Sequence, residues 1–261
     1  MKKSLIIILL CLLLISGCSS KKTPIDTDSK NDKLDVYFTL RDDLYWTFYD
    51  SDEKIKVTSD DVVFWYNEIV GDPEFQSSGY NGQFISMPDG SQAHIDMEKI
   101  DDRTFVFRYP RIISEPLLHC NMDFGPRFIY EKAKKEGGVQ GVKSICSIDM
   151  NPKELPSIGR NYLVEYFPGQ RLVYKRNPHF WEKDINGVAV AYPEEMIVNI
   201  VSDRNTEFLL FNEGKLEGYS PRPEELTDVV NNSGKDYTVF NGGGSLGSGL
   251  WSFNQNPVNK D

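Results

Sequence analysis

The chain has 261 residues, a formal net charge of −10 and an aromatic content of 12 %. This composition is typical of a globular protein with room for one large domain or two smaller ones. Proteins that bind nucleic acid non-specifically need a basic face that neutralises phosphates. The acidic balance therefore argues against that class, and we expect no nucleic-acid partner.

The first 17 residues have the organisation of an export signal. Lys2 and Lys3 form a positive start, and the apolar run at residues 5–15 is too short to span a bilayer as a mature helix. The tetrapeptide Ile-Ser-Gly-Cys that ends at Cys18 matches a lipobox, which predicts cleavage before Cys18 and lipidation of its thiol. Two or more acyl chains on that residue would give stable membrane anchoring. An ordinary secretory signal with an incidental cysteine is the alternative.

Residues 18–33 follow as a polar segment rich in Ser, Lys, Asp and Thr, without an apolar period. Such a composition is typical of a flexible tether. We therefore expect an extracytoplasmic, membrane-anchored protein whose folded body starts at Leu34 and is held off the membrane by this segment.

The body begins with a predicted strand at residues 34–40, and a helix is predicted at residues 61–70. Thr58 is placed to cap this helix, and Asp61, three residues on, can return the hydrogen bond. The adjacent carboxyl groups of Asp60 and Asp61 suggest acid–base catalysis as one interpretation. Negative charge is also favoured at a helix start, and we interpret the pair as part of the cap.

Residues 75–90 are rich in glycine and are predicted to form a loop. The segments at residues 95–100 and 104–109 are predicted to be two strands joined by a turn. A short helix is predicted at residues 129–136, and the pair of glycines that follows is expected to end it.

Cys120 and Cys146 are the two cysteines of the predicted body. An oxidising compartment would permit a disulfide between them, but their Cα separation cannot be derived from the sequence, so paired and free thiols both stay open. His119 beside Cys120 provides two neighbouring donors without a third at ligand spacing. We therefore expect no metal site and no cofactor.

Residues 159–181 carry the most distinctive pattern of the chain. Runs at residues 162–167 and 171–175 are rich in β-branched and aromatic residues and predict a pair of strands. Pro168 pre-sets the first corner of the turn between them, and Gly169 supplies the positive φ that the second corner of a type II turn needs. The Arg-Asn-Pro run that follows stops the second strand, because proline cannot donate a ladder hydrogen bond.

This sequence is more specific than a hairpin requires. Its particular features are Gly-x-x-Tyr from Gly159 to Tyr162, the Pro-Gly turn, and the stop Arg176-Asn177-Pro178-His179-Phe180-Trp181. The pattern resembles the signature of bacterial extracellular solute-binding proteins of family 5, the peptide- and nickel-binding lipoproteins that serve ABC importers. The earlier runs FTLRDDL and TSDDV are also similar to family sequences. Arg-Asn stands after the first glycine, where members usually carry Thr-Gly-Pro or a similar run.

Beyond the hairpin, strands are predicted at residues 196–201 and 237–240, and helices at residues 207–212 and 224–230. A glycine-rich run at residues 241–249 follows these elements. It leads to a Leu-Trp-Ser-Phe-Asn segment that resembles the strand by which family members enter their second lobe.

The resemblance implies an α/β fold of the periplasmic-binding-protein type (type II, family 5) with mixed sheets. It assigns residues 34–152 to a smaller inserted lobe, residues 153–250 to an incomplete main lobe, and residues 251–261 to the start of a second lobe. Members of the family are considerably longer, so we interpret the chain as truncated within that second lobe.

The same resemblance implies where a ligand lies. Family members place the run that corresponds to residues 219–223 at the rim of the ligand cleft. The ligand-binding residues predicted on this basis are Tyr219, Ser220, Trp251, Phe253 and Asn254. Positions in the core are the alternative for the aromatic residues. The chain has only three histidines and none is placed by a motif, so an oligopeptide ligand is favoured over a nickel chelate.

We therefore predict a monomeric, lipid-anchored solute-binding protein of an ABC transporter that binds oligopeptides and works with permease subunits. A degenerate or surface-displayed lipoprotein fragment without transport function is the alternative. The sequence has no Gly-x-Ser-x-Gly, His-Glu-x-x-His or phosphate-loop motif, so we do not expect an enzyme. Because such proteins close two lobes around a solute, this chain alone is expected to bind weakly or not at all.

Overall fold

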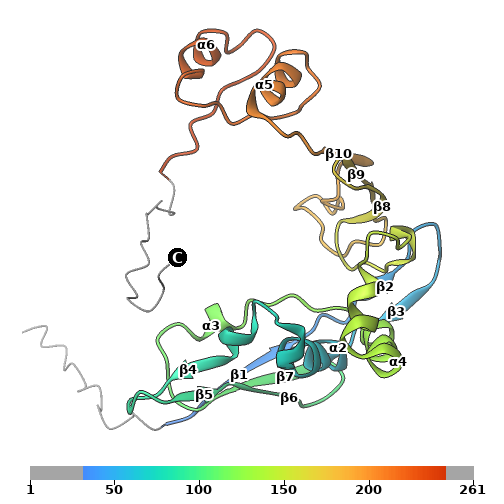
Figure 1. Ribbon diagram of the computed structural model, residues 1–261, viewed down its shortest axis with the longest axis vertical. Helices are drawn as coiled ribbons and strands as arrows, with labels where there is room; N and C mark the ends of the chain where they lie inside the picture. Colours follow the sequence, from blue (N-terminus) through green and yellow to red (C-terminus); the bar gives the residue numbers. More distant parts are fainter. Residues whose placement is uncertain (1–31, 245–261) are drawn as a thin grey trace, which may run out of the picture. The chain divides into compact units, whose positions relative to one another are not determined.

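The computed structural model describes residues 32–244 (Figure 1). These residues fall into two compact units, the first extending to Asn199 and the second beginning at Ile200. Short helices and small antiparallel sheets alternate along the chain, which agrees with the predicted combination of helices and sheets.

The first unit is built on a sheet of three antiparallel strands, in the order β1 (Leu34–Thr39), β7 (Thr104–Tyr109) and β6 (Asp96–Lys99). Phe38 lies opposite Phe105 in the register, and their rings stack with centroids 5.5 Å apart. Cross-strand aromatic pairs of this kind stabilise a sheet that has one face in the core. The three strands predicted for this part of the chain are confirmed.

A helix covers this sheet. It begins as α2 (Ser59–Phe64) and continues with a wider, π-helical turn, η2 (Trp65–Val70). The Thr58 N–H donates a hydrogen bond to Asp61 Oδ2 at 2.9 Å, which confirms the predicted return bond of the cap. The core cluster between helix and sheet contains Val62, Tyr66, Ile85, Ile95, Met97, Phe105, Phe107 and Tyr109.

Two small hairpins belong to the same unit. In the first, β2 (Tyr45–Thr47) pairs with β3 (Lys54–Lys56), and in the second, β4 (Phe84–Ser86) pairs with β5 (Gln92–His94). The second hairpin starts inside the segment predicted to be a loop, so that prediction was wrong there. Ile85 is only 5 % exposed and joins the core cluster, and this burial favours a strand despite the nearby glycines.

The helix predicted to end at the glycine pair is much longer, because α4 extends over Arg127–Ile145. Gly138 does leave the helical conformation, with a φ of +57°, and it marks a kink. The chain becomes helical again beyond it, where Val142 and Ile145 are buried in one cluster with Tyr130. Packing against the rest of the unit therefore extends the helix past its weakest residues.

The predicted hairpin forms a second three-stranded antiparallel sheet. Its strands are β8 (Asn161–Phe167), β9 (Arg171–Arg176) and β10 (Glu195–Asn199), with β9 in the middle. Gly169 has a φ of +69° in the turn between β8 and β9, as the turn prediction requires. Both the hairpin and the strand predicted after it are confirmed.

The boundary predicted after residue 152 lies inside the first unit. Thr47 at the end of β2 exchanges two backbone hydrogen bonds with Ser157, at 3.1 and 2.8 Å. The segment that leads into the β8–β9 hairpin is thereby joined to the N-terminal part of the unit.

Within residues 200–244, the second unit contains two helices, α5 (Arg204–Asn212) and α6 (Leu226–Asn231), at the two predicted places. Asp203 caps α5, because its Oδ1 accepts a hydrogen bond from the Thr206 N–H at 2.9 Å. This short side-chain cap explains why the chain becomes helical directly after Asp203.

The strand predicted at residues 237–240 is not formed, so that prediction was wrong. Tyr237 instead packs on the helices, with its ring centroid 5.0 Å from that of Phe211 and its hydroxyl group donating to the Val229 carbonyl at 3.2 Å. An apolar run without a partner strand among the described residues packs as an extended segment rather than as part of a sheet.

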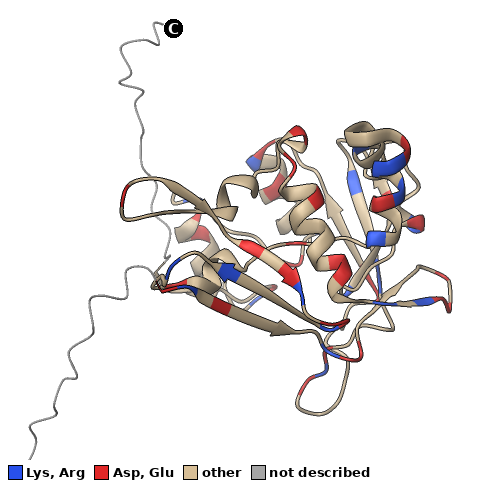
Figure 2. Ribbon diagram, turned by 90° about the horizontal axis from the view of Figure 1, so that it is seen from below, with Lys and Arg blue, Asp and Glu red and all other residues tan. Residues whose placement is uncertain are grey.

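Acidic and basic residues are interspersed on the strands and helices of the described part of the chain (Figure 2). Arg108 on β7, for example, pairs with Asp35 at 2.6 Å and with Glu98 at 2.9 Å on the two neighbouring strands. Charged side chains of opposite sign thus pair across the strands of this sheet.

Candidate functional site

The residues of the distinctive hairpin pattern meet in a buried set of polar side chains. The Tyr162 hydroxyl oxygen lies 2.8 Å from both Thr47 Oγ1 and Asn177 Oδ1. The amide nitrogen of Asn177 donates to Thr47 Oγ1 at 3.2 Å and to the Gly159 carbonyl at 2.9 Å. We call Thr47, Tyr162 and Asn177 the signature network, because it joins the glycine, the tyrosine and the asparagine of the pattern.

The signature network lies too deep to contact a solute. Thr47, Tyr162 and Asn177 are 1 %, 3 % and 2 % exposed. Burial also raises the pKa of Tyr162, which keeps the phenol neutral as a hydrogen-bond donor. Buried polar groups that satisfy one another in this way specify one packing arrangement. The network therefore fixes the β8–β9 hairpin against β2.

A hollow of about 470 Å³ lies beside the signature network and is open to the surface. The residues that line it are Phe48, Tyr49, Asp50, Ser51, Asp52, Tyr162, Arg176, Pro178 and His179. Burial and the nearby Lys54 lower the pKa of His179, so its imidazole is neutral near pH 7. Arg176 is paired with Glu194 at 2.8 Å. The hollow thus combines aromatic and acidic groups with a neutral imidazole.

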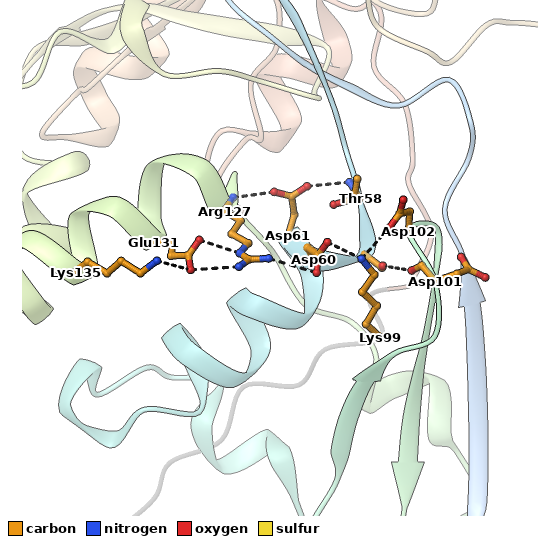
Figure 3. A network of polar contacts seen from close by, with 10 residues as sticks. Thr58, Asp60, Asp61, Lys99, Asp101, Asp102, Arg127, Glu131 and Lys135 are labelled. Carbon is orange, nitrogen blue, oxygen red and sulfur yellow. Dashed lines mark hydrogen bonds and ion pairs between the residues drawn. The ribbon is translucent and has the colours of Figure 1, made fainter.

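A groove of about 500 Å³ lies between the α2–η2 helix and α4. Its lining residues are Asp60, Val63, Phe64, Asn67, Glu68, Arg127, Glu131, Lys134 and Lys135. Next to it, ion pairs link Asp102, Lys99, Asp60, Arg127, Glu131 and Lys135 in that order (Figure 3). The Arg127 guanidinium lowers the pKa of Glu131, so this carboxyl group stays ionised. These charges neutralise one another and offer no unbalanced group to a substrate.

Asp61 has a structural position within the same region (Figure 3). Its Oδ2 accepts from the Thr58 N–H at 2.9 Å, and its Oδ1 accepts from the Arg127 N–H at 2.8 Å. Arg127 is the first residue of α4, so one carboxylate that is 5 % exposed binds backbone donors at the starts of two helices. This geometry agrees with the interpretation as a cap for Asp61, whereas Asp60 instead pairs with Lys99 and Arg127.

The second unit holds the two predicted ligand-binding residues that the structure describes. The Tyr219 ring packs against Phe208 and Phe211, with centroid separations of 5.3 and 5.5 Å. The guanidinium of Arg204 lies 5.0 Å from the centroid of the same ring and donates a hydrogen bond to the Ser220 carbonyl. Tyr219 is half-buried, whereas Ser220 is exposed.

Glu225, directly before α6, completes this arrangement. Its Oε2 accepts from the Tyr219 hydroxyl at 2.6 Å and from the Arg222 N–H at 2.9 Å, and its Oε1 accepts from Arg222 Nε at 2.7 Å. The bond from Arg222 holds the pKa of Glu225 at about 2, well below its usual value. We call Arg204, Arg222 and Glu225, with the tyrosine that they hold, the Tyr219 clamp.

Arg204, Arg222 and Glu225 were not among the site residues predicted from the sequence. The spacing Arg222-x-x-Glu225 at a helix start is a recognisable signal for an ion pair. No comparable signal links Arg204 to Ser220, because 16 positions separate the two residues.

Four predicted residues lie outside the described part of the chain. They are the lipidation residue Cys18 and the ligand-binding residues Trp251, Phe253 and Asn254. The described part of the chain therefore contains two of the five predicted ligand-binding residues, Tyr219 and Ser220, which are adjacent in the sequence.

Cys120 and Cys146 are both free thiols, and the structure does not join them. Cys120 follows α3 (Pro116–His119), and its Sγ lies 3.2 Å from the Tyr109 hydroxyl oxygen. Cys146 ends α4 and is exposed, with its Sγ 3.4 Å from the Tyr130 hydroxyl oxygen. Each thiol thus packs against a different tyrosine from a different core cluster.

Between residues 32 and 244, no three His, Cys, Asp or Glu side chains are grouped so that they could hold a metal ion. Over the same residues, no helix is long and apolar enough to cross a bilayer.

Residues 26–261 match the sequence profile described as "Bacterial extracellular solute-binding proteins, family 5 Middle". The chain belongs to this family. Proteins of family 5 are binding proteins of transport systems and not enzymes, which agrees with the expectation from the sequence that the chain is not an enzyme. The resemblance seen in the hairpin pattern is thereby confirmed.

Similar proteins agree with this assignment. A "Probable ABC transporter-binding protein" of Deinococcus radiodurans is 29 % identical over 198 residues, which cover 73 % of this chain and 31 % of that protein. The structure of DppA from Helicobacter pylori in complex with the peptide STSA gives a TM-score of 0.57 at 15 % identity, over 76 % of this chain and 37 % of that one.

The structure of the periplasmic binding protein MelB from Agrobacterium fabrum, in complex with stachyose, also gives a TM-score of 0.57, at 20 % identity. That match covers 77 % of this chain and 29 % of the other. These similarities show the periplasmic-binding-protein fold predicted from the sequence. The chain spans about a third of the length of the relatives that it matches.

Proposed function

We propose that this chain forms part of the ligand-binding body of a solute-binding protein that serves an ABC importer, and that the solute is an oligopeptide. The observation that carries the proposal is the family match over residues 26–261. The relative from Deinococcus radiodurans bears a transporter-binding name, and the DppA structure contains a peptide. The MelB structure contains an oligosaccharide, so sugars are the alternative ligand class that a test must include.

In this proposal the ligand contacts Tyr219, Ser220, Trp251, Phe253 and Asn254. The rim at Tyr219 and Ser220 combines an aromatic ring with hydrogen-bonding groups at the surface of the second unit. Extended peptides are recognised by such combinations, because backbone hydrogen bonds supply affinity while open pockets tolerate different side chains.

The proposal also includes a lipid anchor at Cys18 and a monomeric protein that delivers its ligand to permease subunits. The lipobox motif that ends at Cys18 and the polar tether that follows support the anchor. Replacement of the residue (Cys18→Ser) is expected to release the protein from the membrane fraction of expressing cells. Retention of the variant in that fraction would contradict the anchor.

Thermal unfolding of the full chain in detergent micelles tests the binding function. A ligand that binds only the native state raises the midpoint by mass action. Since this chain supplies only part of a closed site, we expect a dissociation constant near 1 mM, and 10 mM of a tetrapeptide pool then adds about 1.4 kcal/mol of stability. For a chain of this size, that corresponds to a rise of about 3–5 °C.

A midpoint that rises with the tetrapeptides, and not with an equal concentration of free amino acids, supports an oligopeptide receptor. A thermal midpoint that does not change with peptide concentrations up to 10 mM contradicts the oligopeptide receptor. That outcome would favour the alternative of a surface-displayed lipoprotein without transport function.

A further inference from the structure

The hydrogen bond between Tyr219 and Glu225 determines whether the Tyr219 hydroxyl group can donate to or accept from a ligand. The hydroxyl donates to Glu225 Oε2 at 2.6 Å. A phenol has one hydrogen, and an ionised carboxylate can only accept. The hydrogen of Tyr219 is therefore used inside the protein, and its oxygen is left with lone pairs. Tyr219 can accept a hydrogen bond from a ligand but cannot donate one.

Glu225 is fixed in the position that imposes this direction. Its side chain is 7 % exposed and receives hydrogen bonds from the backbone and the guanidinium of Arg222. Arg222 in turn donates to Asn205 Oδ1 on α5 at 2.9 Å. The carboxylate is thus tied to α5 through Arg222, and it cannot turn away from Tyr219 without losing several charge-assisted bonds.

Arg204 acts on the neighbouring residue. Its guanidinium donates to the Ser220 carbonyl and lies over the Tyr219 ring. The Ser220 carbonyl thus has one donor within the protein, while Ser220 itself is exposed. The rim as a whole combines the partly exposed Tyr219 with the exposed Ser220.

We propose that Glu225 is a positioning residue that sets the ligand specificity of this rim by making Tyr219 an acceptor, so that a bound solute must present a hydrogen-bond donor to the Tyr219 oxygen. The donor is a backbone N–H of a peptide or an O–H of a sugar. The inference rests on the proposed function, which places Tyr219 at the ligand. Arg222 donates hydrogen bonds to Glu225, and Arg204 contacts the Ser220 carbonyl and the Tyr219 ring.

The test uses four variants of the full chain and two ligands. Tyr219→Phe keeps the ring and removes the oxygen. Glu225→Gln introduces an amide that can donate to the Tyr219 oxygen and so reverse the direction of the bond. Glu217→Gln makes the same chemical change at an exposed position of the same segment and is the matched control. The fourth variant combines Tyr219→Phe with Glu225→Gln. Apparent dissociation constants for the tetrapeptide pool and for stachyose come from thermal midpoints titrated against ligand concentration.

We expect Tyr219→Phe and Glu225→Gln each to weaken binding about fivefold, the loss that corresponds to one neutral hydrogen bond, while Glu217→Gln stays within about twofold. The double variant should bind no more weakly than Tyr219→Phe alone, because both changes remove one interaction. A purely structural role of Glu225 would lower the unliganded midpoint and leave these affinities unchanged or additive. The unliganded transition of each variant also reports whether it has folded.

The outcomes separate this inference from the proposed function. Peptide binding that is equal in wild type, Tyr219→Phe and Glu225→Gln overturns the inference and leaves the peptide function standing. Binding of stachyose alone, with the expected dependence on Tyr219 and Glu225, supports the inference and contradicts the peptide function. Binding of neither ligand by the wild-type chain overturns both.

Discussion

The signature network and the Tyr219 clamp use the same chemistry at different depths. Each centres on a tyrosine hydroxyl that bonds to a polar side chain, Asn177 in the first unit and Glu225 in the second. Tyr162 is 3 % exposed and is enclosed with Thr47, whereas Tyr219 is half-buried beside an exposed serine. The enclosed network can only stabilise the fold, whereas the proposed function places the partly exposed Tyr219 at the ligand.

Depth also decides how much each arrangement contributes to stability. When one partner of an enclosed hydrogen bond is removed, the remaining polar group is buried without any partner, because water cannot reach it. The protein then loses the full desolvation free energy of that group. In the clamp, Arg204 and Arg222 are 46 % and 32 % exposed, so water screens part of the charge around the buried Glu225 carboxylate. We therefore expect larger stability losses in the signature network than in the clamp.

The largest loss is expected for Asn177→Ala. This change removes the partners of the Tyr162 hydroxyl and the Gly159 carbonyl, and we expect it to lower the free energy of unfolding by about 3 kcal/mol. Urea unfolding measures the change. Asn186→Ala, at an exposed turn, is the control and should stay within about 0.5 kcal/mol of wild type. Equal effects at the two positions would remove the distinction between enclosed and open polar groups.

A smaller loss is expected for Asp61→Ala. The change deprives the N–H groups of Thr58 and Arg127 of their acceptor, and we expect a loss of about 2 kcal/mol. Its neighbour is the matched control, because Asp60 is a partly exposed ion-pair residue and Asp60→Ala should cost less than about 1 kcal/mol. A larger loss at Asp60 than at Asp61 would show that the surface ion pairs, and not the shared cap, join the two helices.

The turn of the hairpin allows a test that involves no polar side chain. Gly169→Ala places a Cβ at a φ of +69° and should cost about 1 kcal/mol. Gly137→Ala, in α4 with open space at the Cβ position, should instead stabilise the chain by about 0.5 kcal/mol. Thermal midpoints of the two variants are expected to move in opposite directions. A stabilising Gly169→Ala would mean that the network, and not the turn, determines the hairpin.

The smallest expected effect is the pH dependence of the clamp. The pKa of Glu225 is lowered from 4.5 to about 2, mainly by Arg222 and further by Tyr219. A carboxyl group with a lowered pKa contributes stability above its unfolded pKa, and that contribution is lost as the pH falls from 4.5 toward 2. The midpoints of wild type and Glu225→Gln should therefore differ at pH 6 and converge in this window. Glu217→Gln should follow the wild type throughout, and parallel curves for Glu225→Gln would contradict the assignment.

The sequence predicted the local features of the fold well. The Pro168–Gly169 turn and the Thr58–Asp61 cap depend on backbone geometry that a few adjacent residues dictate. Such features can be derived without knowledge of the rest of the chain. The hairpin pattern also led to the right family, although its physical meaning appeared only in the structure.

Contacts between distant residues could not be predicted in this way. Thr47 lies 115 positions before Tyr162, and no pattern in the sequence joins them. The length of α4 was underestimated for the same reason, because burial of Val142 and Ile145 outweighs the helix-breaking tendency of the glycines before them. The hydrogen bond from Arg204 to Ser220 likewise could not be predicted, because it depends on how the second unit folds.

Under the proposed function, the signature network serves the fold and the Tyr219 clamp serves the ligand. Paired measurements of stability and tetrapeptide affinity on Asn177→Ala and Tyr219→Phe test it most directly. We expect the first variant to lose about 3 kcal/mol of stability while its folded fraction binds like wild type, and the second to lose less stability than the first while its binding weakens about fivefold. Loss of affinity in folded Asn177→Ala, or unchanged affinity in Tyr219→Phe, would contradict the claim.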